Sequence, residues 1–333
     1  MYDKGLSVLE RYGLTSQATY RGRGALICET QAGLKQIKPF EGSAKRLERQ
    51  NQLLEHLQAC GHEHLDIILR NEEGSLTSTD KEGYTYLVKN WWDGRECDVK
   101  NQEDVCRGMQ QLARLHKDMF LKTEQGENPE NLIETYQKHN QGMKKIRSYV
   151  RRRRQKNDFE YLFLKHVERY LSYGTRALEQ LEHSGYSEMR WQCWENGTAC
   201  HGEYNQHNIL MRGEQIAAVN FDHFRFEDQT ADIAQFMRKM MEKHGWNKGL
   251  AEDMLEAYSS VRPLSHEEWN CLAIRLSYPE KFWKVTSFYY NNNKAFLSSR
   301  HQEKMVNLLR QETLWQEFMN SLFGNSLFPD NPI

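Results

Sequence analysis

A tight polar loop that runs into a short apolar strand is the feature of this sequence that most constrains the fold. The loop and strand form the segment CHGEYNQHNILM, from Cys200 to Met211. A second apolar segment, 216–222, follows after the residues RGEQ. Two apolar segments joined by a short turn that contains Gly predict a β-hairpin. Polar groups lie at its open end, so we expect a functional site there.

The spacing of the polar residues in this loop is typical of phosphoryl transfer. In protein kinases an H-x-D-x-x-x-x-N loop supplies the catalytic base and one metal ligand, and a nearby Asp supplies another. Here Glu203 and Asn208 keep the five-residue step, with Glu in the place of Asp. The second acidic position is Asn220, followed by Asp222. The sequence therefore predicts a kinase-like site in which two charged groups are altered.

These alterations bear directly on metal binding and catalysis. Magnesium requires oxygen ligands, usually one or two carboxylates with phosphates and water. Asn208 offers a carbonyl oxygen, whereas Asn220 is neutral, and Asp222 is expected to substitute in part because it projects to the same strand face. Glu203 places its carboxylate one methylene further out, and a misplacement of ~1 Å can cost on the order of a hundredfold in rate. We expect His201 to brace the loop rather than to transfer protons.

The first part of the chain predicts a small β-sheet lobe. A short amphipathic helix is expected over 3–13, and a longer helix over 44–59. The turn at 21–24 contains two glycines and fits either a loop that covers a phosphate or an ordinary hairpin turn. Strands are expected over 18–30, 33–38, 65–70 and 84–89.

A kinase-like site also needs a lysine for the nucleotide phosphates, held by a glutamate from the following helix. Lys35 is the first candidate, and Lys38 is its alternative if the strand register differs. Glu48 is the first candidate for the partner and Glu55 is the second. The alternative interpretation of each is an ordinary solvated side chain.

The segment after the last of these strands, which contains Asn90 and Trp91, is expected to be a hinge. In a kinase-like fold its backbone groups bind adenine, while the alternative is a buried aromatic pair at a lobe boundary. We place that boundary between a lobe at 1–93 and a mainly helical lobe at 94–333. Helices are expected over 102–117, 131–150, 156–183, 229–244, 247–259, 265–275 and 301–322.

The composition and charge balance of the chain exclude some classes of partner. The chain carries 45 Lys and Arg against 46 Asp and Glu, so it is no general polyanion binder, and we expect no nucleic acid partner. The basic run Arg151–Arg154 with Lys156 is interpreted as a solvated face. No apolar run approaches ~20 residues and no apolar signal core is present, so we expect neither a membrane partner nor secretion. The seven cysteines include no C-x-x-C and predict reduced thiols in a cytosolic chain.

Several segments together resemble a known family. CHGEYNQHNIL (200–210), VNFD (219–222) and DIAQFMRK (232–239) are similar to the aminoglycoside phosphotransferase/choline kinase-like fold. The hinge YLVKNWWDGREC (86–97) and the late segment SYPEKFWK (277–284) resemble, more narrowly, the CotS family of bacterial spore coat proteins. The likeness spans nearly the whole chain in order.

The resemblance implies an α+β, protein kinase-like fold of two lobes. A five-stranded antiparallel sheet with one main helix would form the small lobe, and the larger lobe would be mainly helical, with ATP and Mg²⁺ between them. By position, the resemblance implies that Lys35 holds phosphates and pairs with Glu48, that Glu203 replaces the catalytic Asp, and that Asn208 and Asn220 take the metal-binding positions. The remaining candidate residues come from the sequence pattern: Asn90 and Trp91 for the nucleotide, His201 for the catalytic loop and Asp222 for the metal.

Two functions follow from this resemblance. The first is a spore coat-associated pseudokinase, made in the cytoplasm, that binds a nucleotide and has weak or no phosphotransferase activity. The alternative is an active ATP- and Mg²⁺-dependent phosphotransferase that acts on a small-molecule hydroxyl acceptor through Glu203 and Asp222. The expected partners are a nucleotide together with such an acceptor or with other coat proteins.

Overall fold

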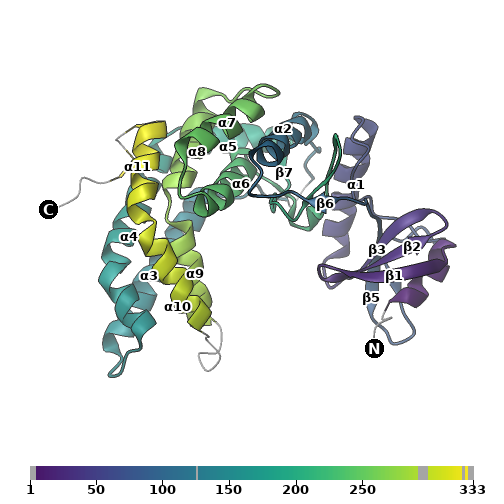
Figure 1. The fold of residues 1–333 in the computed structure, drawn as a ribbon, viewed down its shortest axis with the longest axis horizontal. Coiled ribbons are helices and arrows are strands. Elements are labelled where there is room, and N and C mark those ends of the chain that lie inside the picture. Colours follow the sequence, from purple (N-terminus) through teal and green to yellow (C-terminus); the bar gives the residue numbers. More distant parts are fainter. Residues whose placement is uncertain (1–4, 125–126, 292–298, 325–326, 329–333) are drawn as a thin grey trace. The chain divides into compact units, whose positions relative to one another are not determined.

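The computed structural model describes residues 5–124, 127–291, 299–324 and 327–328 (Figure 1). Contacts divide the chain into two compact units. Unit 1 consists of Met1–Glu124, Asn196–Arg225 and Ala257–Arg262, and unit 2 consists of the remaining segments. The polar loop and hairpin therefore belong to the same unit as the N-terminal sheet. This is a different division from the predicted lobe boundary between residues 93 and 94, which stays a prediction.

Unit 1 contains a five-stranded antiparallel sheet, as the resemblance implies. Its strands lie in the order β1-β2-β3-β5-β4, and the single long helix α1 (Ala44–Ala59) follows β3 along the chain (Figure 1). Ser43 begins this helix, because its side chain accepts a hydrogen bond from the Arg46 backbone N–H. The strands are β1 (Ser16–Gly22), β2 (Ala25–Thr30), β3 (Gly33–Pro39), β4 (Ser78–Thr79) and β5 (Thr85–Asn90).

One face of this sheet is covered by the N-terminal segment. The predicted helix over 3–13 is a 3₁₀ helix, η1 (Leu6–Tyr12), and its Val8 and Leu9 pack with Ile37 and Val88 of the sheet. The prediction of a regular strand over 65–70 is wrong. This segment makes only isolated bridges to Ala218 and to Lys89 and forms no continuous strand. The apolar composition indicated a buried extended segment correctly, but pairing with two different partners prevents a regular ladder.

The predicted hairpin forms the second sheet of unit 1. Strands β8 (Ile209–Arg212) and β9 (Gln215–Ala218) pair antiparallel, with Ile209 opposite Ala218. Strand β6 (Arg95–Glu96) pairs with the other edge of β8. Asn101 caps helix α2 (Gln102–Asp118), because its side chain accepts hydrogen bonds from backbone N–H groups of the first turn. The short 3₁₀ helix η2 (Phe221–His223) follows β9. Two short strands complete the set: β7 (Ala199–Cys200) and β10 (Arg225–Phe226).

The described part of unit 2 is helical, as predicted, but some of its helices differ from the predicted ones. The predicted helix over 301–322 is two helices that meet at Gln311, and two helices that the sequence did not predict, α5 and α9, are present. Stacked aromatic rings fill the core, such as Tyr136 on Tyr278 with ring centroids 3.6 Å apart. The helices are α3 (Leu132–Arg152), α4 (Asp158–His183), α5 (Tyr186–Glu195), α6 (Thr230–Lys243), α7 (Lys248–Ser259), α8 (His266–Ser277), α9 (Glu280–Asn291), α10 (Ser299–Arg310) and α11 (Glu312–Phe323), with the end of α7 in unit 1.

The α+β class predicted from the sequence is confirmed by this combination of a small antiparallel sheet and many helices. In the part of the chain that is described, no helix combines the length and the apolar character needed to cross a membrane.

Candidate functional site

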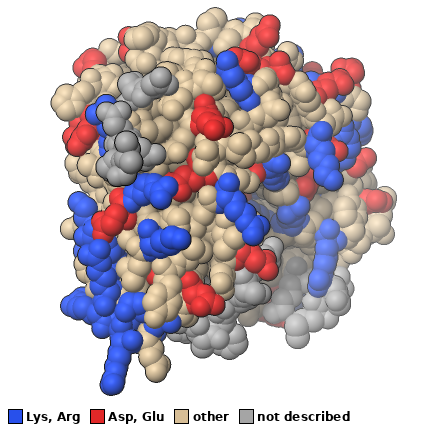
Figure 2. Space-filling view, turned by 60° about the vertical axis from the view of Figure 1, so that its left-hand side comes forward, with Lys and Arg blue, Asp and Glu red and all other residues tan. Residues whose placement is uncertain are grey.

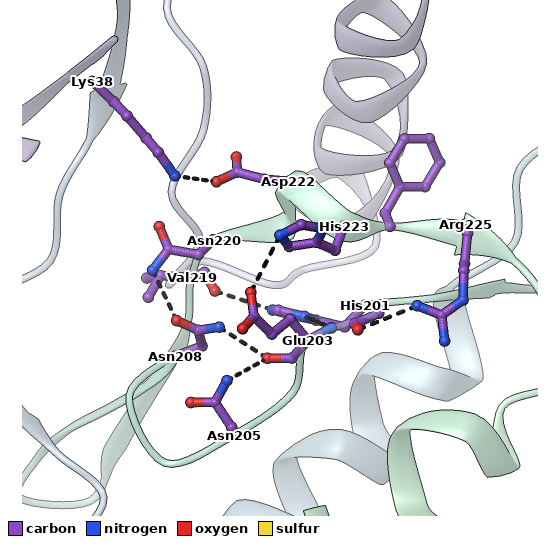
Figure 3. Close-up of polar contacts among 12 residues, drawn as sticks. Lys38, His201, Glu203, Asn205, Asn208, Val219, Asn220, Asp222, His223 and Arg225 are labelled. Carbon is purple, nitrogen blue, oxygen red and sulfur yellow. Dashed lines mark hydrogen bonds and ion pairs between the residues drawn. The ribbon is translucent and has the colours of Figure 1, made fainter. Parts of the chain in front are cut away.

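The polar loop is braced from inside by His201. Its ring is fully buried, and its Nδ1 accepts the backbone N–H of Glu203 at 3.2 Å. The ring proton therefore resides on Nε2, which donates to the Val219 backbone oxygen at 3.0 Å (Figure 3). A neutral ring with both nitrogens engaged matches the expected bracing role.

Gly202 makes the tight loop possible. Its φ is +80°, and a Cβ at this position would lie 1.9 Å from the backbone oxygen of His223. Only glycine adopts this conformation and tolerates so close an approach. The loop and the η2 segment that follows the hairpin are therefore held against each other at this point.

Glu203 directs its side chain away from the brace. Its carboxylate is 45% exposed and lies 3.4 Å from His223 Nε2 (Figure 3). The backbone oxygen of Glu203 accepts from the amides of Asn205 and Asn208, each at 2.9 Å. The position that the sequence assigns to the catalytic carboxylate is thus held by backbone hydrogen bonds, with an accessible acidic side chain.

The two asparagines predicted as metal ligands contact each other. Asn220 Nδ2 donates to Asn208 Oδ1 at 2.9 Å (Figure 3). Asn220 has a φ of +65°, in the left-handed region that Asn tolerates better than most residues, and its backbone N–H donates to Asp66 Oδ2 at 2.9 Å. The side chains are therefore brought together as predicted, but through an amide–amide hydrogen bond.

Asp222 is the centre of an ion-pair cluster. Lys38 Nζ donates to its Oδ2, and Lys89 Nζ donates to its Oδ1 at 2.9 Å. Lys89 is fully buried and also donates to Asp66 Oδ2 at 3.0 Å, while Gln50 Nε2 lies 3.3 Å from Asp222 Oδ1. Burial opposes the charge on Asp222, but the two ammonium groups outweigh it and hold its pKa well below the ordinary range.

The predicted pair of Lys35 and Glu48 is wrong. Lys35 is buried on the face of β3 that carries Ile37, where it donates to the Ala32 backbone oxygen, and burial lowers its pKa. Glu48 is bound by Arg70, with Nη2 to Oε1 at 2.6 Å. Side chains alternate between the faces of a strand, so residues three apart lie on opposite faces. Lys38, the register alternative, is the lysine of this strand that contacts Asp222 in η2.

The predicted hinge residues occupy a junction between the two sheets of unit 1. The Asn90 backbone N–H donates to Ile67 O at 2.8 Å, and the Trp91 backbone N–H donates to Leu34 O at 3.0 Å. Trp91 and its neighbour Trp92 pack against a small cluster of the hairpin region formed by Leu210, Ala217 and Val219. The aromatic pair is partly buried, whereas the alternative interpretation expected a buried pair, and its role toward adenine stays a prediction.

The turn at 21–24 and His207 meet at one carboxylate. Arg23 donates to Glu96 through Nε at 2.6 Å and Nη2 at 3.1 Å, and His207 Nδ1 lies 2.6 Å from Glu96 Oε2. Burial opposes the charge on Glu96, but these hydrogen bonds outweigh it and lower its pKa. The turn between β1 and β2 is therefore tied to Glu96 near the end of the predicted hinge segment.

The basic run lies at the end of helix α3 and just beyond it, and two of its side chains pair with acidic neighbours. Arg151 Nη2 lies 2.7 Å from Glu168 Oε1, and Arg153 pairs with Glu160. Figure 2 shows a face on which Lys and Arg side chains gather with Asp and Glu among them. These contacts fit the solvated face that the sequence predicted, and the ion pairs are an addition from the structure.

Sequence reasoning missed Lys89 and Asp66, which are fully buried. Each is a charged residue inside an apolar segment, LDIIL for Asp66 and YLVK for Lys89. Charged side chains are almost never fully buried unless they are paired, so two such segments in one small lobe were a usable signal. Their separation in sequence hid the pairing.

Comparisons with known proteins agree with the resemblance seen in the sequence. Over residues 6–322 the chain matches a family model described as "Spore coat putative kinase YutH". It is 22% identical to spore coat protein S of Bacillus subtilis (strain 168) over 307 residues, which are 90% of this chain and 87% of that protein. The resemblance to CotS-type spore coat proteins is therefore confirmed.

Solved structures share the fold. An aminoglycoside phosphotransferase from Alicyclobacillus acidocaldarius subsp. acidocaldarius DSM 446 matches with a TM-score of 0.84 at 18% identity, covering 96% of this chain and 95% of that one. A spectinomycin phosphotransferase in complex with ADP and spectinomycin matches with a TM-score of 0.63 at 11% identity, covering 98% and 96%. At such identities the likeness shows the fold alone, and it confirms the predicted kinase-like class.

Proposed function

The chain belongs to the spore coat putative kinase YutH family, and from that premise we propose that it is a coat-associated protein that binds a nucleotide and transfers phosphoryl groups weakly or not at all. The observation that carries this proposal is the contact between Asn220 and Asn208, in which an amide hydrogen bond occupies the place where the sequence pattern calls for a carboxylate.

Nucleotide binding is supported by an apolar surface and by a partly exposed lysine of unit 1. The partly buried surface of Trp91 and Trp92 beside Leu210 offers an apolar contact for a base. Lys38, which is 31% exposed and contacts Asp222, offers positive charge for phosphates. The fold-related spectinomycin phosphotransferase was solved in complex with ADP, which favours the same use of the fold here.

Weak or absent turnover is supported by the state of the acidic groups. Phosphoryl transfer depends on metal ions and a base that are positioned together. Asp222 is engaged by two lysines, and Asn220 carries no charge to attract a cation. The magnesium ligands predicted from the sequence, Asn208, Asn220 and Asp222, therefore do not fit a Mg²⁺ site in their present contacts.

An active phosphotransferase is the second candidate, and the side chain of Glu203 favours it. This carboxylate is accessible and lies at the position of the catalytic acid, beside His223. In that function Glu203 would hold the acceptor hydroxyl and take its proton. Its partner would be a small molecule with a hydroxyl group, whereas the coat-associated function requires other coat proteins as partners.

The experiment measures ATP binding and ATP consumption on the same purified chain. We expect ATP to raise the melting temperature, because a ligand at about 100 times its Kd stabilises a protein by about 2.7 kcal/mol, while ADP forms no faster than in buffer. Lys38→Ala should reduce the rise in melting temperature caused by ATP. Lys35→Ala, on the other face of β3, should leave this rise unchanged. The absence of any shift would refute nucleotide binding, and turnover that Glu203→Ala abolishes would establish the active alternative.

A further inference from the structure

The orientation of two side-chain amides at the loop is determined by one backbone oxygen. The carbonyl oxygen of Glu203 can only accept, so the NH₂ group of Asn208 must face it, as it does at 2.9 Å. The Oδ1 of Asn208 consequently faces Asn220, and Asn220 must present its own NH₂ group, also at 2.9 Å (Figure 3). An acceptor at position 220 would be incompatible with this order.

A carboxylate at position 220 would need a cation to fit the same backbone. Its oxygen would face the Oδ1 of Asn208, and two acceptors at hydrogen-bond distance repel unless a donor or a metal ion lies between them. Asn220 supplies that donor itself. The amide therefore closes a gap that a divalent ion would otherwise bridge.

The neighbouring carboxylate, Asp222, is also occupied by contacts within the protein. Asp222 is bound by Lys38 and Lys89, and Lys89 is shared with Asp66, so two positive and two negative groups balance within one cluster. A divalent ion at Asp222 would share this carboxylate with the two ammonium groups, and their positive charges would repel the ion. Among the described residues, no group of three or more His, Cys, Asp or Glu side chains is arranged to hold a metal ion.

We propose that the hydrogen bond from Asn220 to Asn208 takes the place of a divalent cation, so that this chain binds its nucleotide as the metal-free anion. Lys38 supplies the positive charge that meets the phosphates. The statement about the nucleotide rests on the function proposed above, whereas the statement about the cation rests on the contacts of these residues alone.

The test compares wild type with Asn220→Asp, which restores the charge. The Kd for ATP is measured by calorimetry in EDTA and in MgCl₂, and binding of Mn²⁺ alone is measured from the electron paramagnetic resonance signal of the free ion. Asn196→Asp, at an exposed position, adds the same charge away from the loop and is the matched control. Circular dichroism verifies that each variant is folded.

Wild type and the control should bind ATP within about threefold in the two buffers and should bind no Mn²⁺. The Asn220→Asp variant should bind ATP about tenfold or more tightly with Mg²⁺, an ordinary coupling between two ligands, and should bind Mn²⁺. Wild-type binding that requires Mg²⁺, or wild-type binding of Mn²⁺, overturns the inference and leaves nucleotide binding intact.

Failure of the proposed function has a different signature. If wild type binds ATP in neither buffer, nucleotide binding is refuted and the Mn²⁺ measurement decides the cation statement. Binding of Mn²⁺ by folded Asn220→Asp but not by wild type then supports the substitution of the ion by the amide. Equal behaviour of the two folded proteins toward Mn²⁺ overturns it.

Discussion

Lys89 shows how a single residue holds the site together. Its side chain has no exposed surface and lies between Asp66 and Asp222, at 3.0 and 2.9 Å. Burial opposes its charge, but the two carboxylates outweigh burial and raise its pKa. Asp66 in turn binds the backbone N–H of Asn220, so the charge on Lys89 supports the position of the loop residue that distinguishes this site.

Removing this charge should be costly. Lys89→Met leaves two carboxylates without their shared cation, and breaking a buried pair by removing one partner costs about 3–5 kcal/mol. The control is Lys35→Met, because Lys35 is also a buried strand lysine but donates to a backbone oxygen, and its replacement should cost about 1 kcal/mol or less. Urea denaturation of both variants measures the difference, and equal losses of stability would contradict the assigned network.

At the scale of elements, the loop and the start of α2 are fixed by local geometry. The loop requires the positive φ of Gly202 beside the backbone of His223. Helix α2 begins with Asp104 in its first turn, where the carboxylate receives Arg95 and the backbone N–H of Asp98 at 2.9 Å. Both contacts position segments that flank the hairpin.

The loop can be tested with a pair of glycines. Gly202→Ala forces a Cβ against a backbone oxygen, and we expect it to destabilise unit 1 by about 1–3 kcal/mol and to shift the amide resonances of the loop. Gly213→Ala, in the turn of the same hairpin, also meets a positive φ of +56° but has open space, so it should cost about 1 kcal/mol. A Gly202→Ala variant as stable as Gly213→Ala, with an unchanged spectrum, would refute the close contact.

The first turn of α2 should show a defined pH dependence. The hydrogen bond from Arg95 is the main cause that holds the pKa of Asp104 below its ordinary value, with the Asp98 backbone N–H adding to it. A depressed carboxyl pKa stabilises the fold above the unfolded pKa of about 3.9, and the effect is lost as the pH falls through the lower folded value.

The Asp104→Asn variant should therefore be less stable than wild type by about 1 kcal/mol at pH 7, since Arg95 is largely exposed and solvent weakens the pair. The difference in the free energy of unfolding between the two proteins should become smaller below about pH 4. Denaturation curves of both proteins from pH 7 to pH 3 test this, and a gap that stays constant or widens toward acid would contradict the assigned cause.

Local patterns predicted most elements, and long-range pairing decided the rest. Helix α1 was predicted with its observed bounds because an apolar stripe followed by a glycine is a local signal. Lys35 and Lys38 could not be separated, because β3 has no clean polar–apolar alternation to show which face meets the loop. The segment 65–70 lies between two partners, and no local pattern reports such a pairing.

At the scale of the whole molecule, every candidate site residue from the sequence lies in unit 1, including the loop that lies far along the chain from the sheet. The family match and the kinase-like fold explain why the loop keeps its spacing. The identities at positions 203 and 220 then determine what the spacing achieves, because the same backbone presents a glutamate and an amide where the kinase pattern has two aspartates.

We propose that this fold keeps its architecture while the altered residues at positions 203 and 220 suppress phosphoryl transfer. The most direct measurement is the rate of ADP formation from Mg-ATP by purified wild type and by the double variant Glu203→Asp with Asn220→Asp. We expect a wild-type rate no greater than that of buffer and a measurable rate for the double variant. Turnover by wild type that Glu203→Ala abolishes, with no gain in the double variant, would contradict the account.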